Sequence, residues 1–214
     1  ASSSSGSYQG PPQDGSRPGI FYVNAYDLKA RPRYAMESLY LHEATPGHHF
    51  QIALQRELTE LPAFRRFGGE TAYNEGWGLY AESLGKELGV YTDPAMYFGA
   101  LSAELWRSIR LVTDTGIHAK GWTRQQVLDF MYANSAVEPA VAISEAERFM
   151  AIPGQALAYK IGELKIRELR TRAEKALGPK FDLRAFHTEV LKDGSLPLDV
   201  LEAKIDRWIA AQAG

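Results

Sequence analysis

The sequence contains no cysteine, which excludes disulfides and thiolate metal sites, so any metal must be bound by histidine and carboxylate side chains. No apolar run approaches the roughly 20 residues that span a bilayer. The net charge of -2 includes no basic surplus for binding nucleic acid or an anionic membrane. The N-terminal residues lack the basic start and apolar core of a signal peptide. What remains is the composition of a globular domain, with 45% hydrophobic residues.

Composition divides the chain into two parts. Residues 1–19 are rich in serine, glycine and proline, which predicts a flexible leading segment. Residues 20–214 have the length of a single domain. Its first stretch, Ile20–Asn24, is aromatic and β-branched, and it predicts one strand at the edge of a small sheet.

The remainder of the domain has a helical pattern. Apolar residues recur at helical spacing from about Tyr34 onward. The longest predicted helix covers residues 155–177, between a Pro-Gly pair and a Gly-Pro pair. Two capping boxes, at residues 123–126 and 144–147, predict the N-termini of further helices. We therefore expect a predominantly α fold, a multi-helix domain with a minor strand element.

One short stretch holds three of the five histidines, at positions 42, 48 and 49. It begins like the His-Glu-x-x-His helix of zinc metallopeptidases, in which two histidines one turn apart bind the metal and the glutamate activates water. In this chain the motif begins with His42 and Glu43. However, Pro46 occupies the position expected for the second histidine.

A regular helix through Pro46 cannot form this metal site. Each residue turns an ideal helix by about 100° and advances it by about 1.5 Å, so His48 would lie about 120° from the face of His42 and His49 about 10 Å along the axis. Two ligands of one zinc ion must lie closer together. Pro46 and Gly47 disfavour regular helix, and a distortion there would bring His48 to the metal. We predict His48 as the second ligand, with His49 as the alternate.

A glutamate further along the chain can complete the site. Glu75 lies 33 residues after His42, in an Asn-Glu-Gly-Trp run with helical pattern. Zinc peptidases of the gluzincin type take their third ligand from such a glutamate on a following helix. Without the first motif, Glu75 would be interpreted as a surface carboxylate. Glu82, two turns later on the same face, is placed to hydrogen-bond a histidine ligand.

Six ordered motifs resemble those of the bacterial family catalogued as domain of unknown function 885, over nearly the whole chain. They are residues 14–22, 42–51, 75–82, 110–118, 153–162 and 186–194. The resemblance implies a mostly helical, zincin-like metallopeptidase of the gluzincin kind, whose members are often exported and usually much longer. This chain would then be the C-terminal part, and the missing N-terminal part would complete the cleft.

Carried onto this sequence, the resemblance implies Zn²⁺ bound by His42, His48 and Glu75, with Glu43 as general base. Gly78 is a departure, since the family usually has alanine there. Zinc lowers the pKa of a bound water toward ~7 and polarises the scissile carbonyl of a peptide or small amide. Glu43 would take the proton of that water and pass it to the leaving amine.

Further residues are candidates for supporting roles. The tetrahedral oxyanion needs a second donor, for which His118 and Tyr159 are candidates. Arg110 and Asp114 lie one helical turn apart, so an intrahelical ion pair is expected, with Asp114 behind the site. Arg110 alternatively holds a substrate carboxylate. We expect His187 to be structural.

The leading interpretation is a zinc-dependent hydrolase of peptide or amide bonds. Two alternatives remain open at this point. One is a non-catalytic binding module that keeps a structural metal site, and the other is a hydrolase of non-peptide esters or amides. Endo- or exopeptidase mode, oligomeric state and compartment are not encoded in any of these motifs.

Overall fold

The computed structural model of the chain describes residues 5–26, 28 and 31–213. Within this range the fold is predominantly α, as predicted, with a two-stranded antiparallel sheet. The helices are α1 (Met36–Glu43), α2 (His48–Glu57), α3 (Ala63–Phe67), α4 (Thr71–Ser83), α5 (Pro94–Lys120), α6 (Arg124–Asn134), α7 (Pro139–Ala151), α8 (Gln155–Leu177), α9 (Leu183–Leu191) and α10 (Leu198–Ala213), with 3-10 turns η2 (Arg33–Ala35) and η3 (Gly178–Lys180). In the described part of the chain, no helix has both the length and the apolarity needed to cross a membrane.

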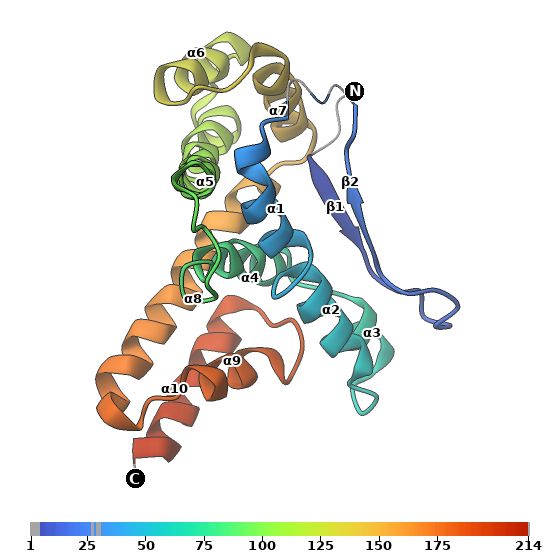
Figure 1. Ribbon diagram of the computed structural model, residues 1–214, viewed down its shortest axis with the longest axis vertical. Coiled ribbons are helices and arrows are strands. Elements are labelled where there is room, and N and C mark those ends of the chain that lie inside the picture. The colour runs from blue at the N-terminus through green and yellow to red at the C-terminus, as the bar shows by residue number, and fades with distance from the viewer. Residues whose placement is uncertain (1–4, 27, 29–30, 214) are drawn as a thin grey trace.

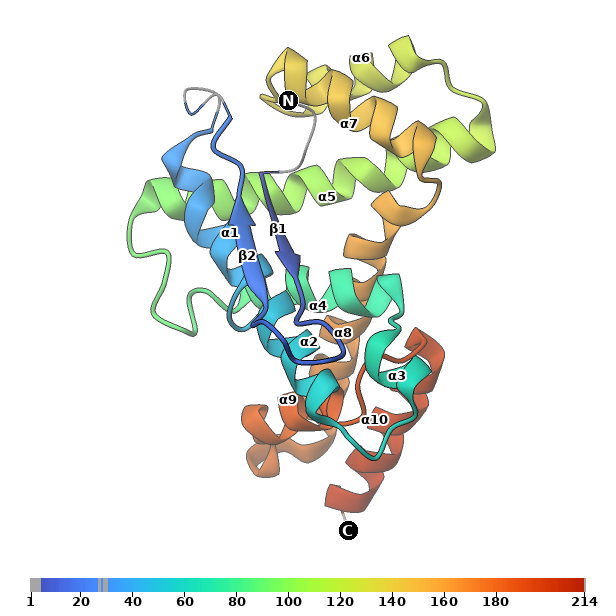
Figure 2. The same cartoon turned by 90° about the vertical axis from the view of Figure 1, so that its right-hand side faces the viewer.

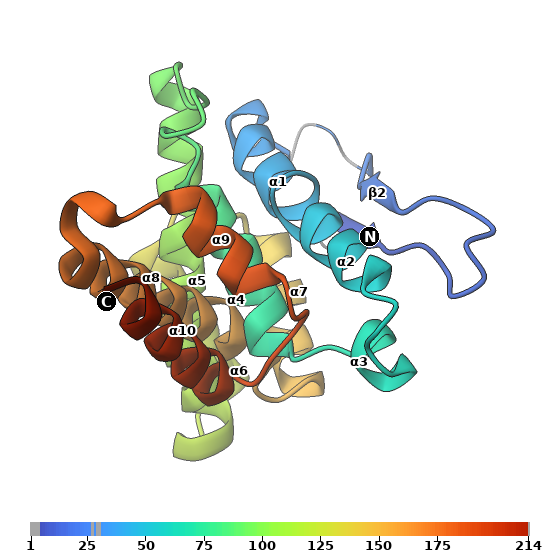
Figure 3. The ribbon, with the colours of Figure 1, turned by 90° about the horizontal axis from the view of Figure 1, so that it is seen from below.

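The helices form two groups joined by α8 (Figure 1). One group contains α5, α6 and α7, and the other contains α9 and α10 beside the distal half of α8. Helix α4 crosses α8 near the middle of the molecule, and α1 and α2 lie against α4. Seen from below, α9 lies next to α2 and α10 lies beside α8 (Figure 3). The junction of α1, α2, α4 and α8 positions the site described below.

Two short strands, β1 (Gly6–Gln9) and β2 (Ile20–Val23), form an antiparallel hairpin that contacts α1 and α2 through β1 (Figure 2). The sequence predicted β2 but placed the β1 residues in a flexible segment, and here the structure differs. Tyr8 of β1 pairs with Phe21, and its hydroxyl lies 3.1 Å from Nδ1 of His49. Pairing across the hairpin therefore orders this part of the segment. Residues 1–4 lie outside the described residues.

Helix boundaries mostly agree with the local sequence. Helix α6 begins with the predicted capping box, in which Thr123 and Gln126 each accept a hydrogen bond from the other's backbone N–H. Helix α8 has the predicted bounds. The capping box predicted at Ser144 is wrong, because α7 already begins at Pro139. Proline lacks only an N–H that would be unpaired in the first turn, so it starts this helix at little cost.

Two clusters of buried side chains stabilise these groups. The first lies among α4, α8, α9 and α10 and includes Trp77, Ile166 and Phe186. The second lies among α5, α6, α7 and the start of α8 and includes Met131 and Phe149. Full burial of each such side chain contributes about 1.5–3 kcal/mol. Because α8 belongs to both clusters, it holds the two helix groups in one relative position.

A pair of glycines allows the crossing of α4 and α8. A Cβ atom added to Gly162 would lie 1.8 Å from the carbonyl oxygen of Ala72, and one added to Gly76 would lie 2.5 Å from Cα of Gly162. Both contacts involve backbone atoms that cannot rotate away. Since α4 also carries Glu75 and Glu82, this close approach helps to set the position of the candidate metal ligands.

We expect Gly162→Ala to lower the free energy of unfolding by at least about 1–3 kcal/mol, because the added methyl group overpacks the crossing. Urea denaturation followed by circular dichroism measures this change. Lys175→Ala, on the exposed face of the same helix, is the matched control and should change stability by less than about 0.5 kcal/mol. A Gly162→Ala variant as stable as the parent would contradict the close approach.

His187 has the structural position that the sequence suggested. Its Nε2 lies 2.8 Å from the Tyr80 hydroxyl, and its ring meets Trp77 edge to face. Burial, together with the positive charge of Arg170, lowers the pKa of His187 to about 4, with a smaller opposing effect of Glu87. The folded protein therefore keeps this ring neutral at pH values where the unfolded chain protonates it.

This pKa shift predicts an acid-side loss of stability. Between pH 6.5 and pH 4 the unfolded chain binds a proton at His187 that the folded chain does not, so stability falls as the pH falls through that window. Allowing for partial solvation of the ring, we expect a contribution of about 1–2 kcal/mol. His187→Gln can still hydrogen-bond Tyr80 but cannot titrate. Its unfolding free energy, measured at pH 6.5 and 4.5, should fall less than that of the parent. Parallel pH profiles would rule this out.

Candidate metal centre

The chain leaves the helical path at Pro46. Helix α1 ends before the loop 44–47 and α2 begins after it, and the peptide bond preceding Pro46 is cis. Gly47 passes close to the end of α1, where a Cβ atom would lie 1.9 Å from the carbonyl oxygen of His42. The indole N–H of Trp77 donates to the carbonyl of Pro46 at 2.7 Å and ties the loop to α4. The loop thus has a defined path, supported from a neighbouring helix.

Three side chains meet at this break. Nε2 of His42 and Nε2 of His48 lie 3.4 and 3.2 Å from Oε2 of Glu75 on α4. The two imidazole rings stand edge to face with their centres 4.6 Å apart. His42 is buried, and the side chains of His48 and Glu75 are only 13% and 16% exposed. His49 instead lies exposed against Tyr8 of the hairpin. The structure therefore brings His48, and not His49, to His42 and Glu75.

The arrangement fits a tetrahedral metal ion. Atoms that bind zinc at about 2.1 Å in tetrahedral geometry lie about 3.4 Å from one another. The distances from Oε2 of Glu75 to the two histidine nitrogens match this value, and all three donor atoms lie within 4.8 Å of one another. Oε2 of Glu75 is buried, and its contacts with the two histidine nitrogens do not have hydrogen-bond geometry. Two imidazoles and one carboxylate, with the fourth position left for water, form the donor set of a catalytic zinc.

The electrostatics of the cluster also favour a cation. Burial disfavours the charged ring of His42, yet the carboxylates of Glu75 and Glu82 raise the pKa of His42 to about 9. Burial likewise disfavours ionised Glu75, yet His42 and His48 hold the pKa of Glu75 well below its usual value. Positive charge is thus stabilised between the imidazoles and the carboxylate. A proton is the smallest occupant of that position, and a metal ion would satisfy the same groups.

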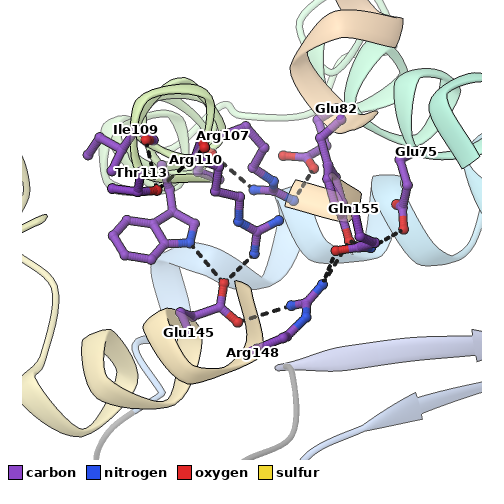
Figure 4. A network of polar contacts seen from close by, with 12 residues as sticks. Glu75, Glu82, Arg107, Ile109, Arg110, Thr113, Glu145, Arg148 and Gln155 are labelled. Carbon is purple, nitrogen blue, oxygen red and sulfur yellow. Dashed lines mark hydrogen bonds and ion pairs between the residues drawn. The ribbon is translucent and has the colours of Figure 1, made fainter. Parts of the chain in front are cut away.

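Glu82 supports His42 from behind. Its Oε1 lies 2.8 Å from Nδ1 of His42 and 2.7 Å from Nη2 of Arg107, and the Ser38 hydroxyl donates to Oε2 (Figure 4 shows Glu82 and Arg107). Engagement of Nδ1 by a carboxylate leaves Nε2 free to bind a metal and orients the ring. The position predicted for Glu82 from its helical spacing is therefore the one it occupies.

Gly78 makes room for His42 on the surface of α4. A Cβ atom at this position would lie 2.7 Å from Cε1 of the His42 ring. The alanine expected at this position from the resemblance would require the ring to shift. The departure noted in the sequence therefore has a steric consequence at the metal centre.

Two further residues are candidates for roles at this cluster. Glu43, at the end of α1, is buried, and its carboxylate forms no hydrogen bond or ion pair with any residue that the structure describes. The ring of Tyr159 on α8 stacks on His42 at 5.9 Å with an angle of 19° between the planes. Burial and the negative charge of Glu75 raise the pKa of Tyr159, so its hydroxyl stays protonated. Tyr159 therefore lies beside a candidate metal ligand, and Glu43 directly follows that ligand in the sequence.

The sequence did not single out Gln155, which connects these groups. Its Nε2 donates to Oε1 of Glu75 at 3.1 Å and to the Tyr159 hydroxyl at 3.0 Å. Gln155 lies in the first turn of α8, within the motif 153–162 that carries part of the family resemblance. Its place in this motif was the signal that could have identified Gln155. However, a glutamine has no charge or metal affinity that would have distinguished it from its neighbours.

His118 is not brought to this cluster. It is exposed near the end of α5, and its Nε2 lies 2.9 Å from the carbonyl oxygen of Phe149. This contact joins α5 to α7. Among the oxyanion donors considered from the sequence, Tyr159 is therefore the one that lies next to His42.

The intrahelical ion pair predicted between Arg110 and Asp114 is wrong. Arg110 pairs with Glu145 of α7 at 2.6 Å, and Asp114 accepts a hydrogen bond from the backbone N–H of Gly154 at 3.2 Å. Glu145 lies on α7 and Gly154 directly precedes α8. These contacts replace the pairing within α5. The guanidinium carbon of Arg110 also lies 4.7 Å from the centre of the Tyr159 ring.

Comparison with known proteins gives the chain a family context. The family described as "Bacterial protein of unknown function (DUF885)" matches residues 1–205. The crystal structure of a "putative lipoprotein" from Colwellia psychrerythraea has a TM-score of 0.95 and 47% identity, over 98% of this chain and 36% of that one. A "putative lipoprotein of unknown function" from Shewanella oneidensis has a TM-score of 0.82 and 26% identity, over 92% and 38%. The chain thus spans little more than a third of these relatives. No curated protein matches it.

Proposed function

This chain belongs to the DUF885 family of bacterial proteins, and from its site we propose that it is a zinc-dependent hydrolase of peptide or amide bonds. The observation that carries the proposal is the convergence of Nε2 of His42, Nε2 of His48 and Oε2 of Glu75, with Glu82 on the far nitrogen of His42. Two imidazoles, one carboxylate and an outer carboxylate on a ligand histidine are the recurring construction of catalytic zinc sites.

The residues around the site have roles that suit hydrolysis. Zinc, when bound, supplies a water of lowered pKa and polarises a carbonyl. The carboxylate of Glu43 has no hydrogen-bond or ion-pair partner among the described residues, so it is available to accept the proton of the attacking water and pass it to the leaving amine. The oxygen of Tyr159 already accepts hydrogen bonds from Gln155 and Arg148, so its own proton is available to the oxyanion that develops on the carbonyl.

We further propose that the rest of a longer, exported protein completes the cleft. The two solved relatives are described as putative lipoproteins, and this chain matches 36% and 38% of their length. Large apolar side chains are exposed on α1 and along one face of α5, including Met36, Tyr40, Phe98, Leu101 and Leu105. Apolar surface of this kind is typical of an interface with another part of a protein.

Metal removal tests the proposed function. We expect the purified protein to contain about one equivalent of zinc, and dialysis against a chelator to abolish hydrolysis of acylated peptides. One added equivalent of zinc should restore it. Elemental analysis and a peptide-cleavage assay measure the two quantities on the same sample. Hydrolysis that persists in the metal-free protein would contradict the proposal. Stoichiometric zinc with no cleavage of any peptide would instead indicate a structural metal in a binding module.

A further inference from the structure

Two arginines share a single carboxylate next to the candidate metal centre (Figure 4). Oε2 of Glu145 accepts from Arg110 at 2.6 Å, and Oε1 accepts from Arg148 at 3.0 Å. The nearby Arg107 is paired with a different carboxylate, that of Glu82. Arg148 therefore shares the carboxylate of Glu145 with Arg110, and it meets the next carboxylate of the network, Glu75, only through Gln155. The side chains of Arg110 and Glu145 are 9% and 12% exposed, whereas Arg148, at 26%, is the arginine that solvent and ligands reach.

Arg148 is connected to the metal centre through one side chain. Its Nη2 donates to Oε1 of Gln155 at 2.7 Å, and Nε2 of Gln155 donates to Oε1 of Glu75 at 3.1 Å. Nη2 of Arg148 also lies 3.4 Å from the hydroxyl of Tyr159. The guanidinium is thus held at a fixed position, one amide group away from a candidate metal ligand.

The guanidinium retains hydrogen-bonding capacity. Arginine has five N–H donors, and the contacts of Arg148 with described residues use three of them, toward Glu145, Gln155 and Tyr159. Two donors therefore remain for a ligand, on a guanidinium that shares its one directly paired carboxylate with Arg110. Arginine held by surrounding hydrogen bonds loses little entropy on binding a carboxylate, which makes such contacts strong and specific.

We propose that Arg148 binds a carboxylate of the substrate, so that the preferred substrates are peptides with a free C-terminal carboxylate. The inference rests on the proposed hydrolytic function and adds a substrate class to it. Because Arg148 lies one side chain from Glu75, the carboxylate it binds belongs to a residue next to the scissile bond. The enzyme would then release residues from the C-terminal end. An acidic side chain at the same place offers the same chemistry, and the experiment separates these two sources.

Binding to the metal-free protein tests the recognition independently of hydrolysis. Calorimetry would compare N-acetyl-Phe-Ala with its C-terminal amide. We expect the acid to bind about 10–100-fold more tightly, as for a charge-assisted hydrogen bond. Arg148→Gln should remove this preference while leaving the affinity for the amide unchanged, and Arg148→Lys should restore part of it. Arg124→Gln removes an exposed arginine of α6 that pairs with Glu147, the neighbour of Arg148 on α7, and as the matched control it should keep the preference. Equal binding of acid and amide by the parent would overturn the inference.

Hydrolysis by the zinc-loaded protein separates the two carboxylate sources. Three peptides would be compared, ending in a free carboxylate, in an amide, and in an amidated aspartate. Cleavage of the first alone, with KM raised in Arg148→Gln, supports recognition of the C-terminus. Comparable cleavage of the peptides that end in a free carboxylate and in an amidated aspartate would overturn recognition of the C-terminus. It would show instead that Arg148 recognises any acidic group. Equal cleavage of all three overturns the inference and leaves the hydrolase intact. A preference in binding without cleavage of any peptide overturns the proposed function instead.

Discussion

His48→Ala is expected to weaken zinc binding by more than about 100-fold, while His49→Ala leaves it unchanged. Loss of groups that only support a ligand already costs 10–100-fold in affinity, and loss of a ligand should cost more. The two histidines are adjacent in the sequence, but Nε2 of His48 lies 3.2 Å from Oε2 of Glu75, whereas His49 is exposed against Tyr8. Competition for zinc with a chromophoric chelator measures both affinities.

The His49 variant is the matched control, because it removes the same type of side chain one position along the same helix. Circular dichroism of both variants establishes that α2 remains folded. If His49→Ala lost the metal and His48→Ala kept it, the loop 44–47 would have a different path from the one described here. Glu75→Gln provides an independent test of the third ligand, and it should weaken zinc binding as His48→Ala does.

Glu43→Gln is expected to lower the rate of peptide hydrolysis by about 10²–10⁴-fold while zinc binding stays within a factor of a few of the parent. This range is the usual contribution of a general base and corresponds to about 3–5 kcal/mol of transition-state stabilisation. Glutamine has nearly the shape of glutamate but cannot accept the proton of the attacking water. Because Glu43 does not contact the three candidate ligands by any ion pair, the substitution should leave their geometry unchanged.

A substitution in the same helix controls for a general effect on α1. Glu37 accepts a hydrogen bond from the backbone N–H of Tyr91, which glutamine can also accept. Glu37→Gln should therefore retain both zinc and activity. Rates are to be measured at saturating substrate on samples with equal zinc content. Hydrolysis by Glu43→Gln at the parent rate would remove Glu43 from the role of general base and leave the metal assignment standing.

Local signals in the sequence account for most of the fold. Helix boundaries follow from short-range chemistry, as in the capping box of Thr123 and Gln126 and in the glycines that bound α8. Such signals fail where another local signal overrides them or where a partner lies elsewhere in the chain. Ser144 has the pattern of a capping residue, but it lies inside α7 because the helix already starts at Pro139. Strand β1 was missed because its partner, β2, lies across a hairpin and composition does not reveal pairing.

The residues of the candidate site also fall into those that the sequence could identify and those that it could not. His42, Glu43 and Glu75 could be proposed from their motifs, and Glu82 from its helical spacing after Glu75, because a helix places residues at such intervals on one face. The pairing of Arg110 with Glu145 could not be identified, because the partner comes from another helix. Gln155 and Arg148 were missed for the same reason, since their roles depend on which side chains they meet and not on their own spacing.

The sequence by itself determined the helical class and the set of histidines and glutamates from which a metal site could be built, because helix formation and ligand chemistry are local properties. The choice of His48 over His49 was decided only by the tertiary structure. It depends on the path of the loop 44–47, which the contact of Trp77 with Pro46 and the close approach of Gly47 to α1 establish. Trp77 is far from Pro46 in the sequence, and the approach of Gly47 to α1 depends on how the loop folds back. No local pattern in the sequence therefore specifies either contact.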